Sequence, residues 1–154
     1  MAELSWGDKL KPLGLRTDAG VTRQQFQPTE AGAADDDASA IVFTLKPKKA
    51  LAFTPKKLSF NASRVGTNGG AFDVVVVSGG QATKVGEKIT PQLAKEAPYV
   101  SAHEFDLSSI PATDDIFYVK SIFTTWPPIS SMPSVTSSLL AMWLALWSQY
   151  PATP

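Results

Sequence analysis

Two neighbouring segments in the middle of the chain constrain the fold more than any other feature. Residues 57–63 alternate strictly, with Leu, Phe and Ala on one side and polar residues between them. This period of two is typical of a half-buried strand in an antiparallel sheet. Residues 72–77 contain four consecutive valines, which predicts a central strand covered on both faces. The turn between them contains Asn68-Gly69, a pair that favours positive φ.

Three further segments have the same β-branched and aromatic character, at residues 40–45, 103–107 and 116–123. Turn residues separate these short strands, and no convincing helical pattern lies between them. The sequence therefore predicts an all-β, antiparallel β-sandwich whose core spans residues 39–123.

The two ends of the chain do not show this pattern of short strands separated by turns. Residues 1–38 have little apolar periodicity and are punctuated by Gly and Pro, so we expect a loop-rich segment of the same domain with one short strand at most. Residues 124–154 contain no charged residue and include Pro and Trp. Within them, residues 135–148 predict a short apolar helix, which must pack on the sandwich, on a partner or on a second copy.

Composition excludes several classes of site. The 154 residues fit one domain, and the 14 basic and 14 acidic residues cancel, which argues against a nucleic-acid partner. The absence of cysteine excludes disulfides, Cys-ligated zinc, iron–sulfur clusters and a thiol nucleophile, and a single histidine, His103, excludes a multi-histidine metal site.

No targeting or membrane segment is expected. The N-terminus lacks the basic and apolar regions of a signal peptide. The longest apolar run, at residues 139–147, is shorter than the roughly 20 residues that a membrane-spanning helix needs.

The catalytic motifs that the chain could carry are weak. The Gly-x-Ser-x-Gly pattern does not occur, and the carboxylates of Glu104 and Asp106 share what is expected to be the polar outer face of a strand. We therefore expect a protein that is not an enzyme.

The segments 53–60, 64–70 and 72–74 carry a family resemblance: a Phe-Thr-Pro turn, an alternating strand, an Arg-x-Gly-Thr-Asn-Gly-Gly turn and a β-branched strand. This order is similar to that of the galactose-binding-like accessory domains of polysaccharide-degrading and surface proteins of gut bacteria. The resemblance covers residues 26–123 and implies a jelly-roll sandwich, a secreted or cell-surface location and a non-catalytic, carbohydrate-binding-like role. Such domains end in a strand that pairs back into the sandwich, and residues 124–154 do not look like that strand.

Aromatic side chains in polar, loop-like surroundings are the groups on which a sugar ring would stack. Trp6, Tyr99 and Trp126 have this context, and Arg64 and Asn68 in the glycine-rich turn add polar groups. These five residues are the candidate glycan-binding residues. For Arg64 the alternative is a structural role in the turn.

The resembled sandwiches often hold a structural calcium ion, and the adjacent carboxylates of Asp35, Asp36 and Asp37 are the candidates to bind one. The alternative is a solvated acidic loop, since adjacent carboxylates of an extended chain point in different directions. No other cofactor is expected.

Trp143 and Trp147 are spaced i, i+4 and would share one face of the predicted C-terminal helix. They are the candidate interface residues. They support the alternative function, a structural or self-associating sandwich that forms homo-oligomers through its C-terminal segment.

Overall fold

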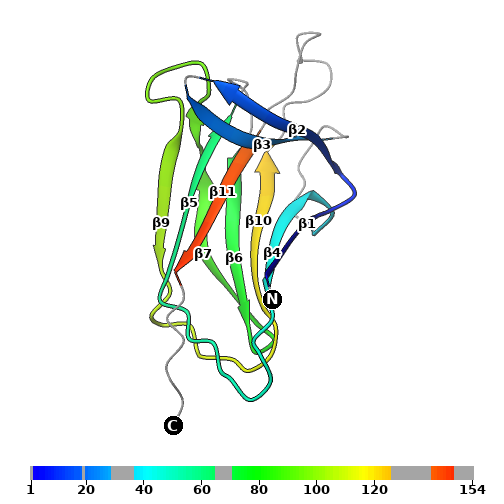
Figure 1. The fold of residues 1–154 in the computed structure, drawn as a ribbon, viewed down its shortest axis with the longest axis vertical. Helices are drawn as coiled ribbons and strands as arrows, with labels where there is room; N and C mark the ends of the chain where they lie inside the picture. Colours follow the sequence, from blue (N-terminus) through cyan, green and yellow to red (C-terminus); the bar gives the residue numbers. More distant parts are fainter. Residues whose placement is uncertain (1, 19, 29–36, 65–70, 126–139, 148–154) are drawn as a thin grey trace.

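The computed structural model describes residues 2–18, 20–28, 37–64, 71–125 and 140–147, and these form two sheets, antiparallel except for one short parallel pair, that pack face to face (Figure 1). The predicted all-β sandwich is therefore confirmed. The first sheet, sheet A, has the strand order β1-β4-β10-β6-β7. Its strands are β1 (Ala2–Trp6), β4 (Ala40–Leu45), β10 (Phe117–Thr125), β6 (Ala71–Ser78) and β7 (Gln81–Ile89).

The second sheet, sheet B, has the order β2-β3-β11-β5-β8, and β9 pairs with the same edge of β5 as β8 does. A short 3-10 helix, η1 (Asp37–Ser39), precedes β4. The strands of sheet B are β2 (Leu10–Asp18), β3 (Val21–Pro28), β11 (Leu140–Trp147), β5 (Lys57–Arg64), β8 (Gln92–Leu93) and β9 (Ser101–Asp106).

The connectivity is that of a jelly roll. If the two-residue strand β8 is left aside and counting starts at β3, one sheet holds the first, eighth, third and sixth strands (β3, β11, β5, β9). The other holds the second, seventh, fourth and fifth (β4, β10, β6, β7), so the chain repeatedly crosses between the sheets. Strands β1 and β2 extend the two sheets by one strand each.

The core lies between the sheets and follows the alternation of the sequence. Leu58, Phe60 and Ala62 of β5 are buried, as their spacing predicts. In β6, Val74 and Val76 are buried while Val75 and Val77 are half-buried, so β6 is central, as predicted, but only one of its faces is fully covered.

The prediction of a loop-rich N-terminal segment was wrong, because β1, β2 and β3 all lie within it. Every residue of β1 is exposed. Strand β1 is held by backbone pairing with β4, which requires no apolar alternation. Strand β2 contains Pro12 and Gly14 at an irregularity of its pairing with β3, which an edge strand tolerates.

The predicted C-terminal helix was also wrong, because residues 140–147 form β11 in the middle of sheet B. Leu, Ala and Met favour helix locally. An extended chain at this place, however, finds backbone partners along β5 from Lys57 to Ser63 and, at its first two residues, along β3. The segment that departs from the resembled pattern in sequence thus supplies the final strand of the jelly roll.

The part of the chain that the structure describes includes no helix of sufficient length and apolarity to cross a lipid bilayer.

Candidate functional site

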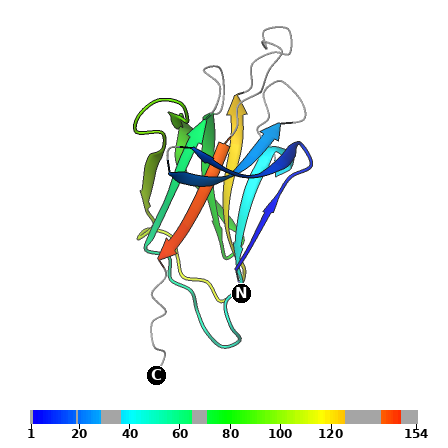
Figure 2. The same cartoon turned by 45° about the horizontal axis from the view of Figure 1, so that its top comes forward.

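The β2–β3 hairpin crosses the outer face of sheet B near the end of β5 (Figures 1 and 2). Strand β3 pairs with β11 at only two positions, up to Ala141, whereas β11 continues along β5 as far as Trp147. Because β3 diverges from the sheet in this way, a pocket of about 380 Å³ opens between the hairpin, β5 and the start of β9.

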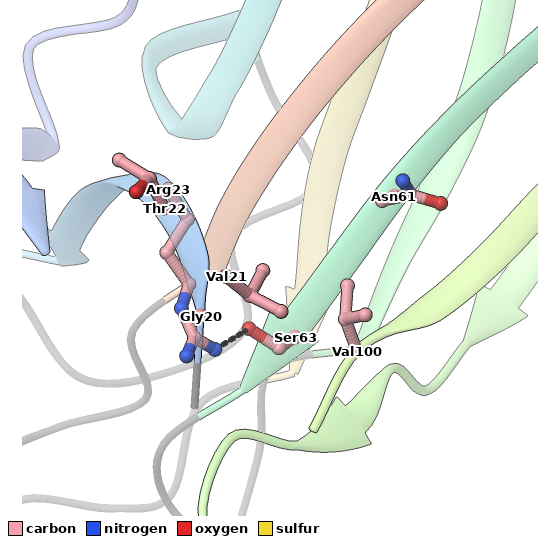
Figure 3. Close-up of a pocket in the computed structure, with 7 residues that line it drawn as sticks. All are labelled: Gly20, Val21, Thr22, Arg23, Asn61, Ser63 and Val100. Carbon is pink, nitrogen blue, oxygen red and sulfur yellow. Dashed lines mark hydrogen bonds between the residues drawn. The ribbon is translucent and has the colours of Figure 1, made fainter. Parts of the chain in front are cut away.

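The pocket combines apolar and polar groups from three elements (Figure 3). The side chains of Val21 and Val100 lie between the Arg23 guanidinium at one end and the Asn61 amide at the other. The lining residues are Gly20, Val21, Thr22 and Arg23 of the hairpin, Asn61 and Ser63 of β5, and Val100.

Arg23 is the central residue of the pocket. The residue as a whole is only 3% exposed, yet it lines the cavity. Its Nη1 donates to the Ser63 Oγ at 2.8 Å and to the Tyr99 carbonyl at 3.3 Å. These two bonds hold the guanidinium in one orientation, against β5 on one side and the loop before β9 on the other.

The loop before β9 is fastened to β5 by hydrogen bonds. The Ala94 N–H donates to the Arg64 carbonyl at 2.8 Å, and the Arg64 Nε donates to the Pro91 carbonyl at 2.9 Å. Tyr99 has a φ of 70°, in the left-handed region that non-glycine residues seldom adopt. Its N–H donates to the Glu96 carbonyl, so the turn is closed while the Tyr99 carbonyl faces Arg23.

Two of the predicted ligand residues lie beside this pocket, and both act there through structural contacts. Tyr99 contributes its carbonyl to Arg23, and Arg64 ties the neighbouring loop to β5. The third, Trp6, lies in β1, where its half-exposed ring contacts the buried ring of Phe26 with 5.4 Å between centroids. Trp6 does not line the pocket.

The remaining predicted glycan-binding residues and the predicted interface residues do not line the pocket in the described part of the chain. Asn68 and Trp126 lie outside the described residues. Trp143 and Trp147 lie in β11, at register positions opposite Asn61 and Lys57 of β5. Strand β11 pairs with β5 from Ala141 to Trp147 and with β3 at Leu140 and Ala141, and association through this segment stays a prediction.

The calcium prediction is not tested by the described residues. Asp35 and Asp36 lie outside them. Both carboxylate oxygens of Asp37 accept hydrogen bonds from the Lys120 Nζ at 3.0 Å, which ties η1 to β10. Within the described ranges, no group of three or more His, Asp or Glu side chains is placed to hold a metal ion.

The carboxylates of β9 occupy the outer face of sheet B. Glu104 is exposed and forms an ion pair with Lys57 at 2.7 Å, across the β5–β9 pairing. Asp106 is exposed and accepts a hydrogen bond from the Ser108 N–H at 2.9 Å, and the hydrogen bonds from Ser108 lower the pKa of Asp106. These contacts fit a solvated strand face and a local turn.

His103 faces the interior, where its ring lies against Phe60 and Phe72 and within 2.8 Å of the Ser101 hydroxyl. Burial lowers the pKa of His103, so the ring is held in its neutral form. Its role is to pack in the core beneath β9.

Sequence reasoning did not identify Arg23, Asn61 and Ser63 as residues of a pocket. Arg23 lies in a segment that was expected to be loop, where a buried cation gives no periodic signal. Asn61 and Ser63 were correctly assigned to the polar side of their strand. An alternating pattern identifies that side, but it does not predict that the β2–β3 hairpin will cross it. Residues 21–26 show no alternation of apolar and polar residues, so the local pattern gave no signal for this strand.

No family model matches the chain, and no curated protein matches it in sequence.

Proposed function

We propose that this protein is a non-catalytic carbohydrate-binding module whose ligand occupies the pocket between the β2–β3 hairpin and β5. The observation that carries the proposal is the convergence of a buried guanidinium, an exposed amide and two valines on one cavity. The jelly-roll order of the strands and the resemblance of residues 26–123 to carbohydrate-associated accessory domains support the same class of ligand.

The chemistry of the cavity suits a sugar ring. A pyranose presents C–H groups on its faces and hydroxyls at its edge. The first can pack on Val21 and Val100, and the second can bond to the Asn61 amide. A volume of about 380 Å³ is at the lower end of the range for small-ligand pockets.

Thermal unfolding of the full chain in the presence of a panel of oligosaccharides tests the proposal, because a ligand of the native state raises the melting temperature. The oligosaccharides that bind should lose about tenfold in affinity with Asn61→Ala, since one to two hydrogen bonds disappear. Gln81→Ala, an exposed amide on β7 in the opposite sheet, is the matched control and should bind as the parent does. Absence of any shift across the panel, or equal losses in both variants, would contradict the proposal.

A second candidate function, self-association, is favoured by a different observation. Leu4, Trp6, Leu13 and Leu15 are exposed, and all four lie on the edge strands β1 and β2. An exposed edge strand with apolar side chains is a template for pairing with another chain. The oligomeric state of the protein separates the two candidates, as described in the Discussion.

A further inference from the structure

We propose that two copies of this protein associate through the edges of their β1 strands, in an antiparallel, two-fold pairing that places Leu4 opposite Leu4 of the second copy. This inference rests on the second candidate function, self-association, and specifies its interface. Joined in this way, the two copies of sheet A form one continuous sheet, because the same edge of each copy meets the other across the two-fold axis.

The backbone groups on the open edge of β1 are the first argument. The Gly7 N–H donates to the Ala40 carbonyl at 2.9 Å, and this pair continues the register of β1 with β4. Hydrogen-bonded pairs alternate along an antiparallel ladder, so the peptide groups of Ala2, Leu4 and Trp6 point away from β4. No other strand in the described part of the chain pairs with β1, so these groups face an edge on which another strand can add.

The side chains on the inner face of β1 are the second argument. Trp6 contacts the buried ring of Phe26 in β3, so its side chain faces the inside of the sandwich. Side chains alternate along a strand, and Ala2 and Leu4 therefore face the same way. Leu4 is 42% exposed and Trp6 is 44% exposed. A strand added at this edge would remove apolar surface from water as well as pair the backbone groups.

The sequence of β1 is complementary to itself, which favours a second copy over an unrelated strand. With Leu4 on the two-fold axis, the inward-facing pairs are Leu4 with Leu4 and Ala2 with Trp6. A small side chain then lies opposite a large ring, and the leucines meet at the centre. Glu3, the charged residue of β1, lies opposite the Ser5 hydroxyl and not opposite a second carboxylate.

The alternative two-fold registers fit less well. An axis at Glu3 places the two carboxylates opposite each other, and like charges directly opposite are destabilising. An axis at Ser5 leaves Ala2 and Glu3 beyond the end of β1 of the second copy. An axis between two residues sets inward-facing side chains opposite outward-facing ones, which the pleat of a sheet does not allow. The pairing centred on Leu4 is therefore the one that β1 favours.

The absence of cysteine from the chain allows a direct test by cross-linking. In a hydrogen-bonded antiparallel pair the two Cα atoms lie about 5.5 Å apart, which a disulfide can span. On mild oxidation, Leu4→Cys should form a disulfide-linked dimer, seen on non-reducing gels, at least tenfold faster than Ser5→Cys. The two copies of residue 5 are diagonal neighbours about 7–8 Å apart, which is too far for a disulfide.

A mixture of two variants tests the register. Glu3→Cys and Ser5→Cys should each fail to cross-link alone, whereas the mixture should cross-link, because residue 3 of one copy lies about 4.5 Å from residue 5 of the other. Both residues are exposed, and neither substitution removes an inward-facing apolar side chain of β1. Retention of the fold by each variant is checked by its melting temperature.

The outcomes distinguish this interface from self-association in general. Light scattering of the parent protein needs no substitution, and a monomer at all concentrations would overturn both and leave the edge to a strand of another protein. A parent dimer in which Leu4→Cys and Ser5→Cys cross-link at equal rates would overturn the β1 pairing and leave self-association supported. Cross-linking of Leu4→Cys without cross-linking of the mixture would overturn the register.

Discussion

At the residue scale, three residues other than glycine adopt a left-handed backbone within the described parts of the chain, and they differ in the contacts that this conformation gives them. Tyr99 presents its carbonyl to Arg23, and Lys88 presents its N–H to the buried Asp73. Ala50, with a φ of 66°, is an exposed residue in the connection between β4 and β5. The left-handed conformation costs a non-glycine residue about 1–2 kcal/mol, so strain at Ala50 can be relieved without loss of a functional contact.

Ala50→Gly should therefore stabilise the protein by about 0.5–1 kcal/mol, after the greater entropy of glycine in the unfolded chain is subtracted. In thermal unfolding this corresponds to a rise of roughly 2 °C for a chain of this size. The control is Ala52→Gly, at a neighbouring exposed position with no positive φ, which should lower the melting temperature. A decrease in both variants would show that the strain at Ala50 is negligible.

Asp73 is the buried carboxylate of sheet A, and it stabilises an irregular stretch of β7. Its Oδ2 lies 2.8 Å from the Lys84 Nζ, and its Oδ1 accepts from the Lys88 N–H at 2.8 Å. Lys88 lies between the residues of β7 that pair with Phe72 and Val74, at a register shift. Burial by itself raises the pKa of Asp73, but the hydrogen bonds from Lys84 and Lys88 and their charges together lower it below 3.8.

Asp73→Asn should destabilise the protein at pH 7 by about 1–3 kcal/mol, since a charge-assisted hydrogen bond is lost. A carboxylate whose pKa is depressed in the folded state contributes stability that is present above its unfolded pKa and is lost as the pH falls through the folded value. The parent should thus lose stability below about pH 4 more steeply than the variant. Urea unfolding at several pH values measures this, and Asp114→Asn, an exposed carboxylate, is the control. Identical slopes for parent and Asp73→Asn would contradict the assignment.

At the element scale, β11 has the greatest effect on the architecture because it joins the two halves of sheet B. It pairs with β3 on one side and with β5 on the other. Leu140, Met142, Leu144 and Leu146 occupy register positions opposite buried residues, which are Phe26, Ala62, Phe60 and Leu58. Without this strand, neither the β2–β3 hairpin nor β5 would have a neighbour at this edge, and the pocket between them would not form.

Leu144→Pro should destabilise the protein by about 3 kcal/mol or more, because proline restricts the backbone and has no N–H to donate inside a strand that pairs with β5 from Ala141 to Trp147. Ala2→Pro is the control, since Ala2 is the first residue of the edge strand β1, where proline is tolerated. The measurement is the unfolding midpoint in urea. Similar midpoints for Leu144→Pro and the parent would show that residues 140–147 are not part of the sheet.

At the scale of the whole molecule, the edges of sheet A differ in how well they are protected from pairing with another chain. Strand β7 carries Lys84, Glu87 and Lys88 and two register shifts, which discourage pairing. Every residue of β1 is at least partly exposed, and the strand has continuous pairing with β4 and contains Leu4 and Trp6. Self-association, if it occurs, should therefore use the β1 edge.

The oligomeric state tests this directly. If the protein is a dimer in size-exclusion chromatography with light scattering, Leu4→Lys should shift it to the monomer, since a charge on an edge strand opposes pairing. Gln81→Lys on β7 is the matched control and should leave the dimer intact. A monomeric parent at all concentrations would contradict self-association. A dimer that dissociates only with Trp143→Gln or Trp147→Gln would instead support the C-terminal interface.

The prediction from sequence succeeded where burial forces a pattern. The expected strands at 40–45, 57–63 and 72–77 correspond to β4, β5 and β6, and those at 103–107 and 116–123 to β9 and β10, because residues facing the core must alternate or be continuously apolar. Strand β1 is exposed throughout, and β7 is mostly exposed or half-buried, so neither needs such a pattern, and both were missed.

The sequence by itself determined the fold class and the apolar face of β5, because the spacing of Leu58, Phe60 and Ala62 is a local property of the chain. The sequence also excluded disulfides and a thiol nucleophile, because the chain contains no cysteine. Only the tertiary structure decided that residues 140–147 are a strand and that Arg23 meets Ser63, 40 residues along the chain. Backbone pairing and the crossing of a hairpin over a sheet depend on partners that are distant in sequence. A local sequence pattern therefore cannot predict them.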